Sequence, residues 1–110
     1  MKHDKIPGWY LHTKEKYPQF VEALEKLGET VRKEGPLDEK TSHLIQLAAA
    51  AAIRSEGAVH SHARRALQAG ASMEEIHHAI LLLTSTIGFP SASAAFSRTN
   101  LFVSFRAQMS

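Results

Sequence analysis

The sequence predicts an all-α domain of about five helices. Apolar residues recur at intervals of three and four along most of the chain, which places them on one face of a helix. Residues that start or stop helices, such as Asp38, Gly70 and Ser72, stand between these segments. No stretch alternates apolar and polar residues as a half-buried strand would, and there is no internal repeat. These observations together favour a purely helical fold.

The chain divides into an N-terminal arm, residues 1–16, and a single helical domain, residues 17–110. The arm has no clear periodicity, and we expect it to pack on the body or on a neighbouring subunit. The first helix of the domain begins at Pro18, which suits a first helical position, and ends near Gly35. Its apolar stripe consists of Phe20, Leu24, Leu27 and Val31.

The second predicted helix is the most apolar segment of the chain. Asp38 is a good N-cap for it, and residues 44–53 are apolar on every side except at Gln46. Such a helix must be buried nearly all round, and four or five short helices can hardly surround one of their own. We therefore expect other subunits to cover part of it, which makes the protein a homo-oligomer.

Three more helices follow. The third ends at about Ala69, because Gly70 stands where a left-handed residue is needed. Its inward stripe is Val59, His62, Ala63 and Ala66. A capping box formed by Ser72 and Glu75 opens the fourth helix, which runs to Gly88. Its apolar face consists of Ile76, Ile80, Leu83 and Ile87. The last helix starts at Pro90.

The composition excludes several functions. The absence of cysteine removes disulfides, thiolate nucleophiles and cysteine-based metal sites. A net charge of +2 without a run of like charges argues against nucleic-acid binding. The N-terminus lacks an apolar signal core, and no apolar stretch reaches the roughly 20 residues of a membrane span. We expect a cytoplasmic protein that binds neither nucleic acid nor membrane.

Chemistry in this chain would depend on histidine, and two of the seven histidines stand out. His62 belongs to the apolar stripe of its helix, whereas His60 points about 200° away from it. His43 begins the buried second helix, where an imidazole needs a polar partner. An inward-facing His62 also fits a hydrogen-bonded core residue. Of the adjacent His77 and His78, at most one faces the core, and the sequence leaves open which.

A series of short motifs spans residues 38–96. It comprises Asp-Glu-Lys-Thr at 38–41, Leu44-Ile45, Glu56, the run from His62 to Leu67, Ala-Gly-Ala at 69–71, Glu74-Glu75-Ile76, and Gly88-Phe89-Pro90. The series resembles the shared core of carboxymuconolactone decarboxylases and AhpD-like alkylhydroperoxidases. The resemblance implies an AhpD-like helical fold, assembled as a homo-oligomer such as a trimer or hexamer.

The peroxidase chemistry of that family is not expected here. Peroxidase members carry a Cys-x-x-Cys pair before the histidine, and the corresponding positions are Ser55 and Ala58. Neither residue forms a thiolate, so a thiol peroxidase is excluded although the family suggests one. The acidic residue of the peroxidase relay corresponds to His43. The chain is more similar to the decarboxylase branch, whose histidine-arginine run matches His62 and Arg64.

The resemblance implies a cofactor-independent lyase or isomerase that acts on a small organic acid or lactone. In the family reaction, carbon dioxide leaves, the electron pair is delocalised toward a lactone carbonyl, and a proton is delivered to carbon. We predict that His62 transfers this proton and that His43 orients it or shares a proton with it. Arg64 or Arg65 would hold the acid group.

Two alternatives stay open at the level of sequence. His43, His62 and His78 could converge on zinc or a similar divalent metal, since three imidazoles leave one position open to water. The chain could instead be a non-enzymatic binding module that keeps the oligomeric AhpD-like scaffold without its thiols. The lyase or isomerase hypothesis needs no cofactor, and it requires the rings of His43 and His62 to lie close together.

Overall fold

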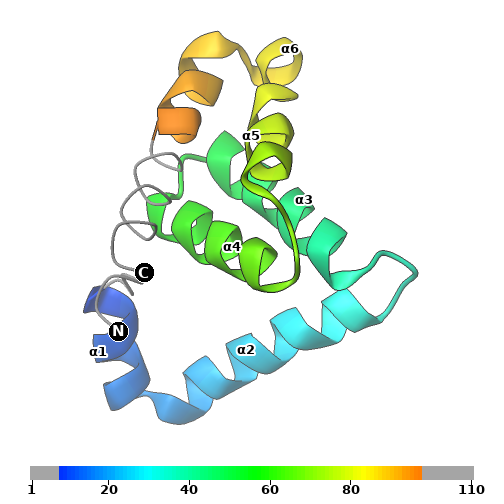
Figure 1. Cartoon of the computed structure of the whole chain (residues 1–110). Helices are drawn as coiled ribbons and strands as arrows, with labels where there is room; N and C mark the ends of the chain where they lie inside the picture. Colours follow the sequence, from blue (N-terminus) through cyan, green and yellow to red (C-terminus); the bar gives the residue numbers. More distant parts are fainter. Residues whose placement is uncertain (1–7, 98–110) are drawn as a thin grey trace.

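The computed structural model describes residues 8–97, apart from the side chain of Trp9, and this part of the chain is helical without any strand (Figure 1). Its helices are α1 (Gly8–Lys16), α2 (Pro18–Lys33), α3 (Glu39–Ala52), α4 (Glu56–Gln68), α5 (Met73–Leu81) and α6 (Thr84–Ile87). Residues 89–97 form a further helical segment. The predicted all-α fold is confirmed, and residues 1–7 and 98–110 lie outside the described residues.

The body of the protein consists of α3, α4, α5 and the helical segment 89–97. Helix α4 packs along α3, and α5 lies against both of them (Figure 1). The buried residues between these helices are aliphatic and many are alanine, which lets the helices approach closely. They are Leu47, Ala50, Ala51, Val59, Ala63, Ala66, Ala71, Ile76, Ile80, Ala92 and Ala95.

The helices of the body begin and end as local chemistry dictates. Asp38 accepts a hydrogen bond from the backbone N–H of Thr41 at 2.7 Å and so caps α3. Ser72 and Glu75 form a complete capping box at the start of α5. Gly70 adopts a φ of 100° just after α4, a conformation that favours glycine. These three boundaries agree with the sequence-based prediction.

The N-terminal region differs from its prediction. Residues 8–16 form the regular helix α1, although the sequence shows no clear periodicity there. Helix α1 packs against α2, and Tyr10 donates a hydrogen bond to Glu25. Helix α2 buries only Val21. Its predicted core stripe, Phe20, Leu24, Leu27 and Val31, is instead 49% to 59% exposed, because no described helix covers it.

Two further differences concern the apolar helices. The helix predicted to run from Ser72 to Gly88 is interrupted by a turn at Leu82 and Leu83, which separates α5 from α6. Helix α3 is buried on one side only, since Ile45 within it and Ile53 directly after it remain exposed in the single chain. Its covering by other subunits therefore stays a prediction. No helix among the described residues is long and apolar enough to cross a membrane.

Candidate functional site

The packing of α3 on α4 brings the two predicted histidines together. His43 lies in the second turn of α3 and is 2% exposed, and His62 lies midway along α4 and is half-buried. Their Nδ1 atoms are 3.2 Å apart, within hydrogen-bond distance, and the ring planes are tilted by 37°. The close approach that the sequence-based hypothesis requires is present.

A carboxylate that the sequence analysis missed completes this pair. Glu39 stands one helical turn before His43, and its Oε2 lies 3.1 Å from His43 Nε2. The signal was available in the sequence, because residues four apart on a helix face the same side. The Glu39 carboxylate is about half-exposed, so the chain of contacts runs from solvent through His43 to His62.

The hydrogen-bond chain determines which ring nitrogens carry protons. An ionised carboxylate only accepts, so the Nε2–H of His43 donates to Glu39. In a neutral His43 the Nδ1 atom is then an acceptor, and the Nδ1–H of His62 must donate to it. The Nε2 atom of His62 is left unprotonated, and no hydrogen bond occupies it within residues 8–97. The arrangement thus presents one basic nitrogen.

Both histidines are held in the neutral form at neutral pH. Burial lowers the pKa of His62 to about 4, and the charges on His43 and Arg65 contribute further. Burial also lowers the pKa of His43; the charge of Arg32 acts in the same direction, while the hydrogen bond to Glu39 opposes it. A neutral imidazole accepts a proton, which is the state that a general base needs.

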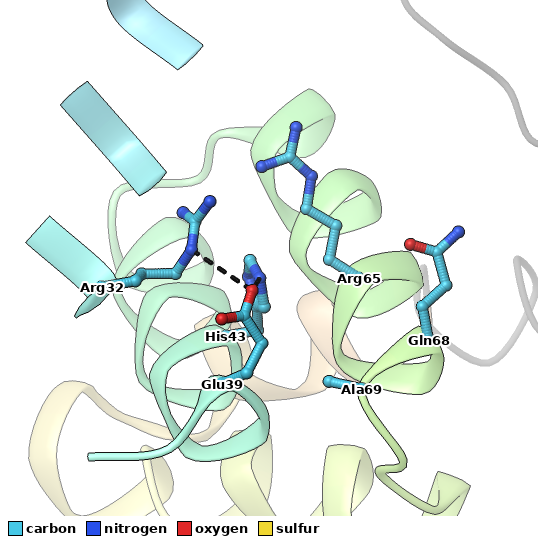
Figure 2. Close-up of a pocket in the computed structure, with 6 residues that line it drawn as sticks. All are labelled: Arg32, Glu39, His43, Arg65, Gln68 and Ala69. Carbon is cyan, nitrogen blue, oxygen red and sulfur yellow. Dashed lines mark hydrogen bonds and ion pairs between the residues drawn. The ribbon is translucent and has the colours of Figure 1, made fainter. Parts of the chain in front are cut away.

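A pocket of about 330 Å³ opens beside His43. Figure 2 shows its wall, where Arg32 from α2 and Arg65 from α4 extend on two sides of Glu39 and His43, with Gln68 and Ala69 completing the lining. Of the two arginines proposed to hold an acid group, Arg65 lines this pocket and Arg64 does not. Arg32 was missed because nothing in the pattern of α2 distinguishes it from a solvated arginine.

The remaining predicted positions lie apart from this pocket. Ser55 precedes α4 at its N-cap position without a capping hydrogen bond from its side chain. Ala58 packs against the core. His77 is the inward member of its pair and stacks on Phe96 at 4.3 Å between ring centroids, whereas His78 is exposed. Helix α5 therefore leaves His78 away from the other two histidines, and no three ligands in the described chain are grouped to hold a metal ion.

Comparisons with known proteins agree with this architecture. The sequence profile of the carboxymuconolactone decarboxylase family matches residues 18–100. An uncharacterized protein of Methanocaldococcus jannaschii is 32% identical over 77 residues, which cover 70% of this chain and 72% of the relative. A crystal structure of a carboxymuconolactone decarboxylase family protein from Legionella pneumophila superposes with a TM-score of 0.73 at 25% identity, covering 86% of this chain and 85% of the other. The chain belongs to the carboxymuconolactone decarboxylase family.

Proposed function

We propose that the protein is a cofactor-independent lyase or isomerase that moves a proton on a small organic acid or lactone. The observation that carries this proposal is the hydrogen-bonded chain from Glu39 through His43 to His62, which ends at an unprotonated imidazole nitrogen. His43 forms part of the wall of the adjoining pocket, and its own two nitrogens are both engaged. His62 is not among the residues that line the pocket, but it carries the free nitrogen of the chain, so it is the ring to which we assign proton exchange with substrate.

The chain of contacts gives the transferred charge a stable place. When His62 Nε2 takes a proton from a carbon next to a carbonyl, its Nδ1 proton passes to His43 Nδ1 over 3.2 Å. His43 then becomes an imidazolium whose Nε2–H still faces the Glu39 carboxylate at 3.1 Å. The positive charge ends beside a negative one. Reversal of these steps returns the proton to another carbon, which is an isomerisation.

The same groups can serve a decarboxylation. The bond between the departing carboxylate and its carbon breaks, carbon dioxide leaves, and the electron pair is delocalised toward the carbonyl oxygen. His62, protonated on Nε2 while His43 is the imidazolium, then gives that proton to the carbon, which forms the new C–H bond, and takes one at Nδ1 from His43. Each turnover consumes one proton, and the half-exposed Glu39 together with His43 links His62 to solvent for its replacement.

The decisive experiment compares two histidine substitutions over a panel of small lactone acids. We expect His62→Gln to lower kcat by about a hundredfold or more, the usual contribution of a positioned acid or base. His78→Gln is the matched control, because His78 is exposed and lies outside the site. Equal turnover by wild type and His62→Gln would refute the proposal.

Glu39 acts in this scheme as a positioning residue, and its role has a distinct signature. In Glu39→Gln the amide oxygen still accepts from His43, but the negative charge that raises the pKa of His43 is lost. We expect kcat to fall and the acid limb of the kcat/KM profile to move to lower pH. A purely structural role would lower the amount of folded protein and leave that limb in place.

A further inference from the structure

The pocket beside His43 has more positive than negative charge. Arg32 and Arg65 are its two cations, and Glu39 is the one carboxylate among the side chains that line it (Figure 2). Because His43 is neutral at neutral pH, two arginines against one glutamate leave one positive charge without a counterpart in the lining. A cavity of this kind favours an anion.

The buried guanidinium of Arg32 has an unsatisfied hydrogen-bond donor. Its side chain is 10% exposed, yet its Nε makes no hydrogen bond within the described chain. The Glu39 carboxylate lies 3.7 Å from that atom, and the hydrogen bond from the guanidinium to Gln46 is long at 3.4 Å. A buried N–H without an acceptor is costly, because it has given up water without replacing it.

Arg65 lines the same pocket, and its side-chain donors have no partner within residues 8–97. No hydrogen bond or ion pair connects its guanidinium to another residue in the part of the chain that the structure describes, and Figure 2 shows its side chain rising from α4, with His43 between it and Arg32 in this view. Two guanidinium groups from different helices, both with available N–H donors, therefore border one small cavity. Guanidinium groups match the planar, two-oxygen geometry of a carboxylate.

We propose that this pocket binds a small organic acid through one carboxylate, which sits between Arg32 and Arg65 and is not the group that reacts. One carboxylate neutralises the unbalanced positive charge and supplies acceptors to the Nε of Arg32. The cavity volume of about 330 Å³ is at the lower end for ligand sites and suits a small molecule. The site thus binds one carboxylate of a small acid.

The anchored carboxylate must remain on the substrate. Decarboxylation disperses the charge of the departing carboxylate, so two guanidinium groups that bind it in the ground state would raise the barrier. A substrate that loses carbon dioxide here would need a second carboxylate, and an acid with one carboxylate would undergo a proton shift instead. This step rests on the proposed function, whereas the binding site itself does not.

Binding of an anion at this position has a consequence for the histidines. Burial is the main reason for the lowered pKa of His43 and of His62, and the positive charges of Arg32 and Arg65 add to it. A carboxylate between the arginines offsets those charges, so it should raise the pKa of both rings. Binding below neutral pH is then accompanied by proton uptake.

The test measures binding of paraconate, a lactone with one carboxylate, and of its uncharged carboxamide by NMR titration of the histidine ring signals. We expect paraconate to bind at least ten times more tightly than the carboxamide and to raise the histidine pKa values. Arg32→Gln and Arg65→Gln should each weaken paraconate binding by about ten- to a hundredfold, as expected for lost charged hydrogen bonds. Arg65 is only partly buried, so its variant remains informative if Arg32→Gln does not fold.

Lys26→Gln is the matched control, since it removes one positive charge from α2 at an exposed side chain that does not line this pocket. Equal affinity for acid and amide, or unchanged paraconate binding in the folded arginine variants, would overturn the inference. Arginine-dependent binding without turnover of any lactone acid would leave the site standing and reject the proposed function. Turnover that depends on His62 but is limited to uncharged lactones would reject the anion site and leave the proposed function standing.

Discussion

The body and the N-terminal helix pair, α1 with α2, differ in how much of their apolar surface they bury. The body buries aliphatic residues from α3, α4 and α5 in one continuous core. Helix α2 has the more regular apolar stripe, yet it buries only Val21 and leaves that stripe about half-exposed. An amphipathic pattern therefore predicts that a helix forms and which face is apolar, but it does not say what covers that face.

The candidate site lies across the boundary between these two regions. Glu39, His43 and His62 belong to the body, where buried packing holds the proton-transfer chain in place. Arg32 comes from α2 and meets α3 through Glu39 and Gln46. Proton transfer and anion binding therefore depend on different parts of the fold. We propose that a second copy of the chain covers the α2 stripe, which would fix Arg32 in position.

The largest expected effect separates the two regions by stability. Ile76 is fully buried in the body, so Ile76→Ala should lower the free energy of unfolding by about 2 to 5 kcal/mol. Leu24→Ala on the half-exposed stripe removes a side chain of similar size and should cost much less in dilute protein. Urea denaturation followed by circular dichroism measures both. Equal losses would show that α2 is as well packed as the body.

The next effect concerns assembly. If the α2 stripe is an interface, Leu27→Lys removes a contact worth roughly 1.5 to 3 kcal/mol and should weaken self-association about tenfold or more. Gln19→Lys is the control, because it adds the same charge to α2 at an exposed polar position that is not three or four residues from any member of the stripe. Sedimentation velocity over a range of protein concentrations reports the result. Unchanged assembly of Leu27→Lys would exclude the stripe as the interface.

A smaller effect tests the local determinants of the body. Asp38→Ala removes the oxygen that caps α3 and should cost about 1 kcal/mol. Asp38→Asn keeps an acceptor and should remain close to wild type in thermal and urea denaturation. Similar destabilisation by both substitutions would mean that the charge of Asp38, rather than its capping hydrogen bond, stabilises the helix.

The smallest expected effect is a pH dependence of stability. His62 has a pKa near 6.5 when unfolded and about 4 when folded, so the unfolded chain binds more protons between these values. The free energy of unfolding should therefore decrease as the pH falls from about 6.5 toward about 4. Because His62 is only half-buried, solvent limits the size of the decrease. His62→Gln should flatten this slope and His78→Gln should not; identical slopes would contradict the assignment.

Sequence alone determined the features that depend on neighbouring residues. The caps at Asp38 and Ser72, the stop at Gly70 and the inward face of His62 follow from local hydrogen bonds and helical periodicity, and the structure agrees with them. The lack of cysteine excluded thiol chemistry without any coordinates. Such features are readable because the chain within a few residues supplies both partners of each interaction.

Only the tertiary structure decided the features that join separate helices. The contact of His43 with His62, the choice of Arg65 over Arg64, the inclusion of Arg32 and the inward position of His77 all depend on how helices cross. Periodicity shows which side of a helix is apolar, but the angle and offset between two helices arise from the packing of many side chains at once. That packing joins His43, which lines the pocket together with the two arginines, to His62, which does not line it.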